Sequence, residues 1–294
     1  DVPDKGTYAK FLLVGCYMKP DEEGVRMYRF DGQTADVDYP CGLRGISNPA
    51  FLTSDSTGNR IYAIGDDEGK SSTANALLFD KESGLLSLLN SQSTDGDLPI
   101  YITLSPKEYF VLTANYKGGS ITVFSQDKKG KLQRDTKIIR FAGNGPNKKR
   151  QEQSHLHCVT FTPDGKFLLA TDLGTDCIYL FPIGKRPEAG KAHSLLDESR
   201  VVRIQMDSGS GPRHICFHPN GRFAYLISEL SGKITVFSYN EGKLERLQTI
   251  VCDPFVAEGN ADIHVSSDGK FLYASKHLKE DGIIVYSIDS QKGT

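Results

Sequence analysis

The stretch SGPRHICFHPNGRFAYLISELSG (210–232) contains two short apolar runs, ICF and FAYLI, separated by the turn sequence HPNGR. Apolar runs of this length on either side of an Asn-Gly pair predict a β-hairpin. The charged residues lie outside the two runs: Arg213 and His214 precede the first, and Glu229 follows the second. A hairpin would therefore bring Arg213 and Glu229 to the same end.

The same strand–turn–strand pattern recurs along the chain. Its turns start 48–57 residues apart, and they read STGNR (56–60), SPKEY (105–109), TPDGK (162–166), HPNGR (218–222) and SSDGK (266–270). Short strands repeating at about 50 residues, with no amphipathic helix between them, predict an all-β fold, a β-propeller of four-stranded blades. A β-sandwich would not explain a repeat of this length.

The number of repeats predicts about six blades in one propeller domain over residues 1–294. The segments 11–17 and 25–31 have the pattern of the second and third strands of a first blade, and the last unit ends before a fourth strand. An open edge strand leaves backbone groups unpaired. Either an N-terminal strand closes six blades, or a C-terminal blade is missing from this chain.

Net charge, apolar runs and cysteine spacing limit the classes of partner and compartment that the sequence favours. The net charge of −2 and the pI near 6.4 give no reason to expect nucleic acid or an anionic membrane surface. No apolar run reaches the ~18 residues of a membrane span. The six cysteines are scattered without a CxxC pair, which favours unpaired thiols in a reducing, cytoplasmic compartment. Asp1 is not a natural start, so a removed leader is compatible with the sequence.

Comparing equivalent positions in the repeats picks out a candidate site. In a propeller, the start of each first strand and the end of each second strand meet around the axis on one face. The residues opening the first strands include His157 and Arg213, between repeats that carry Ile100 and Ala261. The polar residues at these two strand ends are expected to converge on one rim: Asp66, Asn115, His157, Asp172, Arg213, Glu229, Lys276 and His277. For Arg213 and Glu229, a purely structural ion pair is an equal alternative.

Four stretches resemble a known family: ANYKGGSITVF (114–124), HLHCVTFTPDGKFLLATDLGTDCIYLF (155–181), GPRHICFHPNGRFAYLISEL (211–230) and ADIHVSSDGKFLYAS (261–275). They are similar to the propeller-type 6-phosphogluconolactonases, a lactonase family that includes fungal carboxymuconate-lactonising enzymes. The resemblance implies seven blades, of which this chain lacks the last, and lactone chemistry without a metal or cofactor. It also implies a site at His157, Arg213 and Glu229.

The chain departs from the family at a fourth position. The family usually reads Ser-Asn-Arg where this chain reads Ser275-Lys276-His277. A guanidinium binds carboxylate or phosphate with two parallel hydrogen bonds, which histidine cannot reproduce and lysine replaces only by a point charge. The scaffold prediction is unaffected, whereas the substrate prediction is weakened.

These residues suggest a mechanism for opening a sugar lactone, with 6-phosphogluconolactone to 6-phosphogluconate as the expected reaction. His157 is the expected base, and Arg213 the group that binds the oxyanion or the phosphate. Glu229 would orient His157 or act as a base itself. The remaining candidates are expected to bind substrate: Asn115, His155 and Asp172 the sugar, and Lys276 and His277 the phosphate.

Three alternatives remain open at this point. The same rim could bind a protein or a small anion without catalysis, or it could lactonise or isomerise a dicarboxylate. A metal site at His155, His157 and Asp172 lacks a clear further ligand. Two further segments carry no motif: 143–150 is expected to be a solvated loop near the rim, between two blades, and 185–200 a linker with one helical turn.

Overall fold

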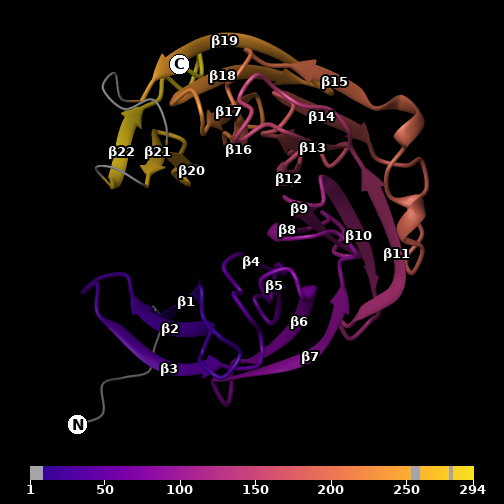
Figure 1. Cartoon of the computed structure of the whole chain (residues 1–294). Coiled ribbons are helices and arrows are strands. Elements are labelled where there is room, and N and C mark those ends of the chain that lie inside the picture. Colours follow the sequence, from indigo (N-terminus) through magenta and orange to yellow (C-terminus); the bar gives the residue numbers. More distant parts are fainter. Residues whose placement is uncertain (1–8, 253–258, 278–280) are drawn as a thin grey trace.

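The structure is a computed structural model that describes residues 9–252, 259–277 and 281–294. Within these residues, 22 strands form six antiparallel sheets arranged as an incomplete ring (Figure 1). Four sheets have four strands, and the first and last have three. The all-β propeller and its six blades, expected from the repeats, are confirmed.

The blades follow one another along the chain, and within each sheet neighbouring strands pair in sequence order. Blade 1 consists of β1 (Ala9–Gly15), β2 (Val25–Asp31) and β3 (Val37–Leu43); blade 2 of β4 (Leu52–Ser54), β5 (Arg60–Asp66), β6 (Ser72–Asp80) and β7 (Leu85–Ser93); blade 3 of β8 (Pro99–Leu104), β9 (Phe110–Asn115), β10 (Ser120–Gln126) and β11 (Leu132–Arg140); blade 4 of β12 (Leu156–Phe161), β13 (Phe167–Asp172), β14 (Cys177–Pro182) and β15 (Val202–Gln205); blade 5 of β16 (Pro212–Phe217), β17 (Phe223–Ser228), β18 (Lys233–Asn240) and β19 (Lys243–Val251); and blade 6 of β20 (Asn260–Val265), β21 (Phe271–Lys276) and β22 (Gly282–Ser287).

The hydrophobic core is divided among the interfaces between blades. Each of the five buried clusters joins two neighbouring sheets; the cluster between blades 3 and 4, for example, contains Leu112, Ile121, Leu168 and Phe181. The sheets pack face to face because each strand alternates side chains between two buried faces. The innermost strands, β4, β8, β12, β16 and β20, contact one another around the axis.

The five sequence turns all connect a first strand to a second strand, as expected. In three of them the fourth turn residue is a glycine with positive φ, at 66° in Gly165 and 71° in Gly221, and in STGNR the third residue, Gly58, has a φ of 69°. Glu108 takes the equivalent place in the SPKEY turn with a φ of 57°. These turns define one face of the propeller, because the inner strands run in the same direction in successive blades.

At the opposite end, four inner strands begin with a β-bulge. The register shifts between Pro99 and Tyr101, between Leu156 and Cys158, between Pro212 and His214, and between Asn260 and Ile263. The additional residues are Ile100, His157, Arg213, and Ala261 with Asp262. A bulge re-aims side chains and ends regular pairing, so each blade presents its bulged residues at the same end of the axis.

The ring is open between blade 6 and blade 1 (Figure 1). The segments expected as the second and third strands of blade 1 are β1 and β2, and the described residues contain no strand that closes the ring. Apolar side chains are exposed on both flanking sheets, including Leu12 and Val14 on β1 and Ile283 and Val285 on β22.

The linker between β14 and β15 contains two short 3-10 helices, η1 (Ala192–Ser194) and η2 (Glu198–Arg200). The second lies in the segment expected to form a helical turn. Neither helix of the described residues has the length or apolar character needed to cross a membrane.

Candidate active site

A cavity of about 570 Å³ lies at the bulged ends of the inner strands. This volume is typical of small-molecule sites. It is lined by Tyr17, Ala50, Phe51, Leu98, Ile100, Tyr116, Arg150, His157, Arg213, His214, Glu229, Ala261, Asp262 and His277. The bulged residues of these four inner strands all line this cavity. Residues at the repeat position selected by the sequence comparison therefore do face one cavity.

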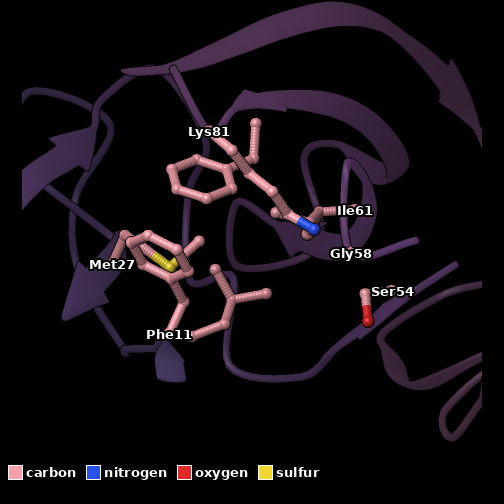
Figure 2. A pocket seen from close by; sticks show the side chains of 8 residues that line it. Phe11, Met27, Ser54, Gly58, Ile61 and Lys81 are labelled. Carbon is pink, nitrogen blue, oxygen red and sulfur yellow. The ribbon is translucent and has the colours of Figure 1, made fainter. Parts of the chain in front are cut away.

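A smaller cavity of about 230 Å³, between blades 1 and 2, has a different lining (Figure 2). Five of its eight lining residues are apolar, including Phe11, Met27 and Ile61. Its one charged group, Lys81, donates a hydrogen bond to the carbonyl of Thr57. Convergent charged groups are therefore found in the first cavity and not in this one.

Glu229 lies at the centre of the larger cavity's charged groups. Nε of Arg213 donates to Oε2 of Glu229 at 3.0 Å, and Nη2 of Arg150 donates to Oε1 at 2.5 Å. The Glu229 side chain is only 8% exposed, whereas that of Arg150 is 38% exposed. Two guanidinium groups share one carboxylate, so N–H groups that Glu229 does not use are left for an anionic ligand.

Arg150 comes from the loop between blades 3 and 4, which the sequence marked only as a solvated loop near the rim. Its neighbour Gln151 is fully buried and donates from Nε2 to Oδ1 of Asp176 at 2.7 Å and to the carbonyl of Leu173 at 2.9 Å. Nη2 of Arg150 also donates to the hydroxyl of Tyr116 at 3.4 Å. This anchoring brings Arg150 into the same cavity wall as His277.

His157 is buried beside this carboxylate. Its Nε2 lies 3.8 Å from Oε2 of Glu229, and its ring meets the rings of Tyr116 and His214 edge to face. Its Nδ1 is buried and has no hydrogen-bond partner within the described part of the chain. Burial lowers the pKa of His157 well below its ordinary value, and the charges of Arg213 and His214 add to this effect. The ring is therefore neutral near pH 7.

A second histidine, His214, forms a hydrogen-bonded pair with Asp262. Nδ1 of His214 lies 2.7 Å from Oδ1 of Asp262, and Oδ2 of the same carboxylate lies 2.9 Å from Nε2 of the exposed His264. Burial alone would raise the pKa of Asp262, but the hydrogen bonds from the two histidines outweigh it and hold the pKa well below its ordinary value. Burial lowers the pKa of His214, although the bond to Asp262 opposes this shift.

Four of the eight candidate site residues line the cavity, namely His157, Arg213, Glu229 and His277. The other four, Asn115, His155, Asp172 and Lys276, are buried but are not among its lining residues. Asp66, also expected at the rim, lines a separate small pocket in blade 2.

Two of the residues outside the wall are centres of hydrogen-bond networks at strand ends. Asp172 is fully buried and accepts four hydrogen bonds, from the side chains of Ser154 and Thr175 and from the amides of His155 and Gly174. The side-chain amide of Asn115 donates to Ser120 and Thr122 at 3.0 and 2.9 Å. Their polar atoms are thus used in fixing loops and strands.

His155 stacks on Tyr116 and uses both ring nitrogens. Nδ1 lies 3.0 Å from the carbonyl of Tyr116 and Nε2 lies 3.1 Å from Oε1 of Glu152. His155, His157 and Asp172, weighed above as metal ligands, do not gather around a common point. Among the described residues, no group of three or more histidine, cysteine or acidic side chains is placed to hold a metal ion.

At the ring opening, Lys276 ends β21 and is 7% exposed. Its neighbour His277 places Nδ1 2.8 Å from the carbonyl of Gly259 while it lines the cavity. The arginine, histidine and acidic residues of the wall that the sequence comparison missed are Arg150, His214 and Asp262. His214 and Asp262 could have been found, because a bulge turns two consecutive residues toward the same side.

Comparison with known proteins gives a consistent result. The family model "Lactonase, 7-bladed beta-propeller" matches residues 11–294. A 6-phosphogluconolactonase of Bacillus subtilis is 33% identical over 288 residues, which covers 95% of this chain and 78% of the relative.

Two solved structures extend the comparison. A Bacteroides fragilis protein, provisionally named a 6-phosphogluconolactonase, is 40% identical with a TM-score of 0.92 over 99% of this chain and 81% of its own. The periplasmic gluconolactonase of Pseudomonas aeruginosa is 29% identical with a TM-score of 0.85 over 98% of this chain and 81% of its own. The chain thus spans about four-fifths of each relative. The family match over almost the whole chain, the propeller fold and the charged axial cavity together show that this chain belongs to the lactonase family of seven-bladed β-propellers.

Proposed function

We propose that this lactonase-family propeller hydrolyses 6-phosphogluconolactone to 6-phosphogluconate in the axial cavity. The observation that carries the proposal is the pairing of Arg213 and Arg150 with the single carboxylate of Glu229 in the cavity wall. Guanidinium N–H groups that Glu229 does not occupy can bind an anionic substrate in this partly enclosed space. The names of the Bacillus and Bacteroides relatives support the same substrate.

Arg213 is proposed to stabilise the oxyanion that forms when water attacks the lactone carbonyl. Its Nε binds Glu229, its Nη1 binds the carbonyl of Ala261 at 2.6 Å, and Nη2 has no acceptor among the described residues. A guanidinium fixed at two nitrogens is preorganised, so it can stabilise developing charge without reorganising during the reaction.

Arg150 is proposed to bind the substrate phosphate. Its side chain is the more exposed of the two arginines, at 38% against 16%, and a guanidinium matches the geometry of phosphate oxygens. His277 lines the wall near the ring opening and is proposed as a second contact to the phosphate. Asn115, His155 and Asp172 keep their predicted sugar contacts only if they leave their present hydrogen bonds. Lys276 keeps its predicted phosphate contact only if its buried side chain moves into the cavity.

The chemistry as proposed uses side chains alone. The carbonyl is activated by Arg213, and a neutral imidazole in the wall takes a proton from water; His157, the base suggested by the sequence, and His214 both lie there. Treatment with a chelator, followed by removal of chelator and metal, is expected to leave kcat unchanged. A loss that added metal restores would contradict this part of the proposal.

The experiment is a hydrolysis assay on 6-phosphogluconolactone and on gluconolactone, with the uncatalysed rate subtracted. Arg213→Ala should lower kcat/KM at least about 100-fold on both lactones, which is typical of losing an oxyanion contact. Arg150→Ala should raise KM about tenfold on the phosphorylated lactone and change it less than threefold on the other. A folded wild type without activity on either lactone would overturn the proposal in favour of a propeller that only binds its ligand.

We further propose a reducing, cytoplasmic compartment, because the six cysteines occur singly along the sequence without a CxxC pair. The Pseudomonas relative, which is named as periplasmic, shows that the family also works outside the cytoplasm. Fractionation of the source cells followed by immunodetection would decide between the two.

A further inference from the structure

We propose that the general base of this site is His214, held by Asp262, and that His157 is a neutral wall residue. This inference rests on the proposed lactone hydrolysis and goes further by assigning the proton transfer to a specific atom, Nε2 of His214. It is carried by the hydrogen-bond partners of the two imidazole rings.

The tautomer of His214 is fixed by its neighbours. The Asp262 carboxylate accepts at Oδ1 from the amide of Ile263 at 2.9 Å and lies 2.7 Å from Nδ1 of His214. An ionised carboxylate can only accept, so Nδ1 of His214 carries the proton and Nε2 carries the lone pair. Nε2 in turn lies 3.5 Å from Nη1 of Arg213, which can only donate. A carboxylate on one side and a guanidinium on the other thus assign the same tautomer.

This arrangement matches the histidine–carboxylate pair of hydrolytic sites. The carboxylate holds the ring in one tautomer and stabilises the imidazolium that forms when the ring takes a proton. The bulge at the start of β16 makes it possible, because it turns both Arg213 and His214 into the cavity wall. The base and the oxyanion group are thus consecutive residues of one rigid strand.

His157 lacks these features. Its Nδ1 is buried, and the Glu229 carboxylate that lies 3.8 Å from its Nε2 already accepts hydrogen bonds from two arginines. Neither nitrogen makes a hydrogen bond to a carboxylate as Nδ1 of His214 does, and burial and the Arg213 charge disfavour a positive ring. His157 therefore fits a neutral group that packs between Tyr116 and His214.

The reaction then balances as follows. Nε2 of His214 removes a proton from water as the water oxygen bonds to the lactone carbonyl carbon, and the carbonyl electron pair moves to the oxygen held by Arg213. The intermediate re-forms the carbonyl and breaks the bond to the ring oxygen, which takes the proton back from Nε2 and becomes a hydroxyl. The carboxylic acid product loses its proton to solvent.

The groups that face His214 determine how its titration responds to mutation. Arg213 and Asp262 contact it directly, His157 and Tyr101 meet its ring edge to face, Phe51 lies beyond them, and His264 acts through Asp262. Asp262 favours the charged ring, so its removal lowers the pKa of His214. Since the base works when it is deprotonated, the fall of kcat/KM at acid pH should then move to lower pH.

The test compares four variants of the full chain on 6-phosphogluconolactone. His214→Gln should lower kcat about 100-fold or more, with KM within threefold, and remove the acid limb of the pH profile. Asp262→Asn should lower kcat at least tenfold and move the acid limb to lower pH. His264→Gln, the matched control that also contacts Asp262, and His157→Gln should both keep the acid limb and at least a third of kcat.

A rescue experiment separates chemistry from folding. Imidazole added to His214→Ala should raise the hydrolysis rate of this variant at least tenfold. Imidazole added to His157→Ala should not raise its rate. A His214→Gln variant that keeps its rate and acid limb while the wild type is active would overturn the dyad and leave the proposed function standing. An inactive wild type would overturn both, and loss of the acid limb in His157→Gln alone would return the base to His157.

Discussion

Blades 4 and 5 have the same strand order and the same inner bulge, yet their acidic residues are used differently. In blade 4 the acid is Asp172, the last residue of β13, and it is buried in a network of four hydrogen bonds. In blade 5 the acid is Glu229, one residue beyond the end of β17, and it lies in the cavity wall between two arginines. A shift of one residue changes the side toward which a side chain points, because strands alternate their faces.

Acidic residues of blade 4 hold in place the segments that carry the cavity's charged side chains. Asp172 holds the chain that leads into His157, and Asp176 of the same loop accepts from the amides of Gly209 and Gly211, just before Arg213. Asp176 also fixes Gln151, the neighbour of Arg150. The TDLGTD segment (171–176) thus positions both arginines without lining the cavity.

The largest expected effect comes from removing the support. Asp172→Ala leaves two buried backbone amides and two hydroxyls without their acceptor, and we expect a loss of roughly 4 kcal/mol in the free energy of unfolding. Urea unfolding would measure it, and kcat of the folded fraction should change less than about threefold. Asp172→Asn keeps part of the hydrogen-bond network and should lower the free energy of unfolding less. If Asp172→Ala lost activity with unchanged stability, Asp172 would instead be a substrate ligand.

The corresponding change in blade 5 should affect activity more than stability. Glu229→Gln removes the charge that orients Arg213 and Arg150 but keeps similar volume in a wet cavity. We expect kcat/KM to fall about 100-fold, which corresponds to about 2.7 kcal/mol, with a melting temperature only slightly lowered. A variant with full activity and a large loss of stability would show that this ion pair is structural, like the network of blade 4.

The pH dependence of stability should reflect the buried histidines of both blades. The pKa values of His157 and His214 are lowered in the folded state, so the unfolded chain binds more protons below about pH 6.5. Stability is therefore full above pH 6.5 and falls as the pH drops below it, by about 1.4 kcal/mol per pH unit for each histidine. Asp262 raises the pKa of His264, which contributes in the opposite sense above pH 6.5.

Unfolding curves at pH 7.5 and pH 5.5 would measure this slope. His157→Gln and His214→Gln should each flatten it, whereas His264→Gln should leave the acid side unchanged. An equally steep slope in both of the first two variants would show that other groups cause it.

The smallest effect should come from the far face of blade 4. Gly165 has a φ of 66°, and a Cβ there would lie 3.5 Å from Pro106, which is ordinary contact. Gly165→Ala should therefore cost only the backbone strain of about 1 kcal/mol, measured by urea unfolding, and leave kcat and KM unchanged. A change in KM would mean that the two faces of the propeller are coupled.

Much of the fold could be predicted because short sequence segments specify each turn and the strands beside it. The five turns, the strands on either side of them and the number of blades follow from residue types at a fixed spacing, since each blade is a unit that must pack on its neighbours. The same comparison correctly brought His157, Arg213 and Glu229 to one cavity. The comparison of repeats also selected Asn115 and Asp172, which do not line the cavity. Repeat position gives the level of a residue along the axis but not the side to which its side chain points.

Residue types at a fixed spacing therefore specify a repeating all-β chain with charged residues at its strand ends. Which of those charges meet depends on how the blades pack around the axis. Arg150 reaches Glu229 across 79 residues of chain and Asp262 reaches His214 across 48, and such pairings depend on where bulges turn side chains and on how loops are anchored. The periodicity of apolar residues predicts the strands and the alternation of their side chains. Contacts between blades form only when the sheets pack around a common axis.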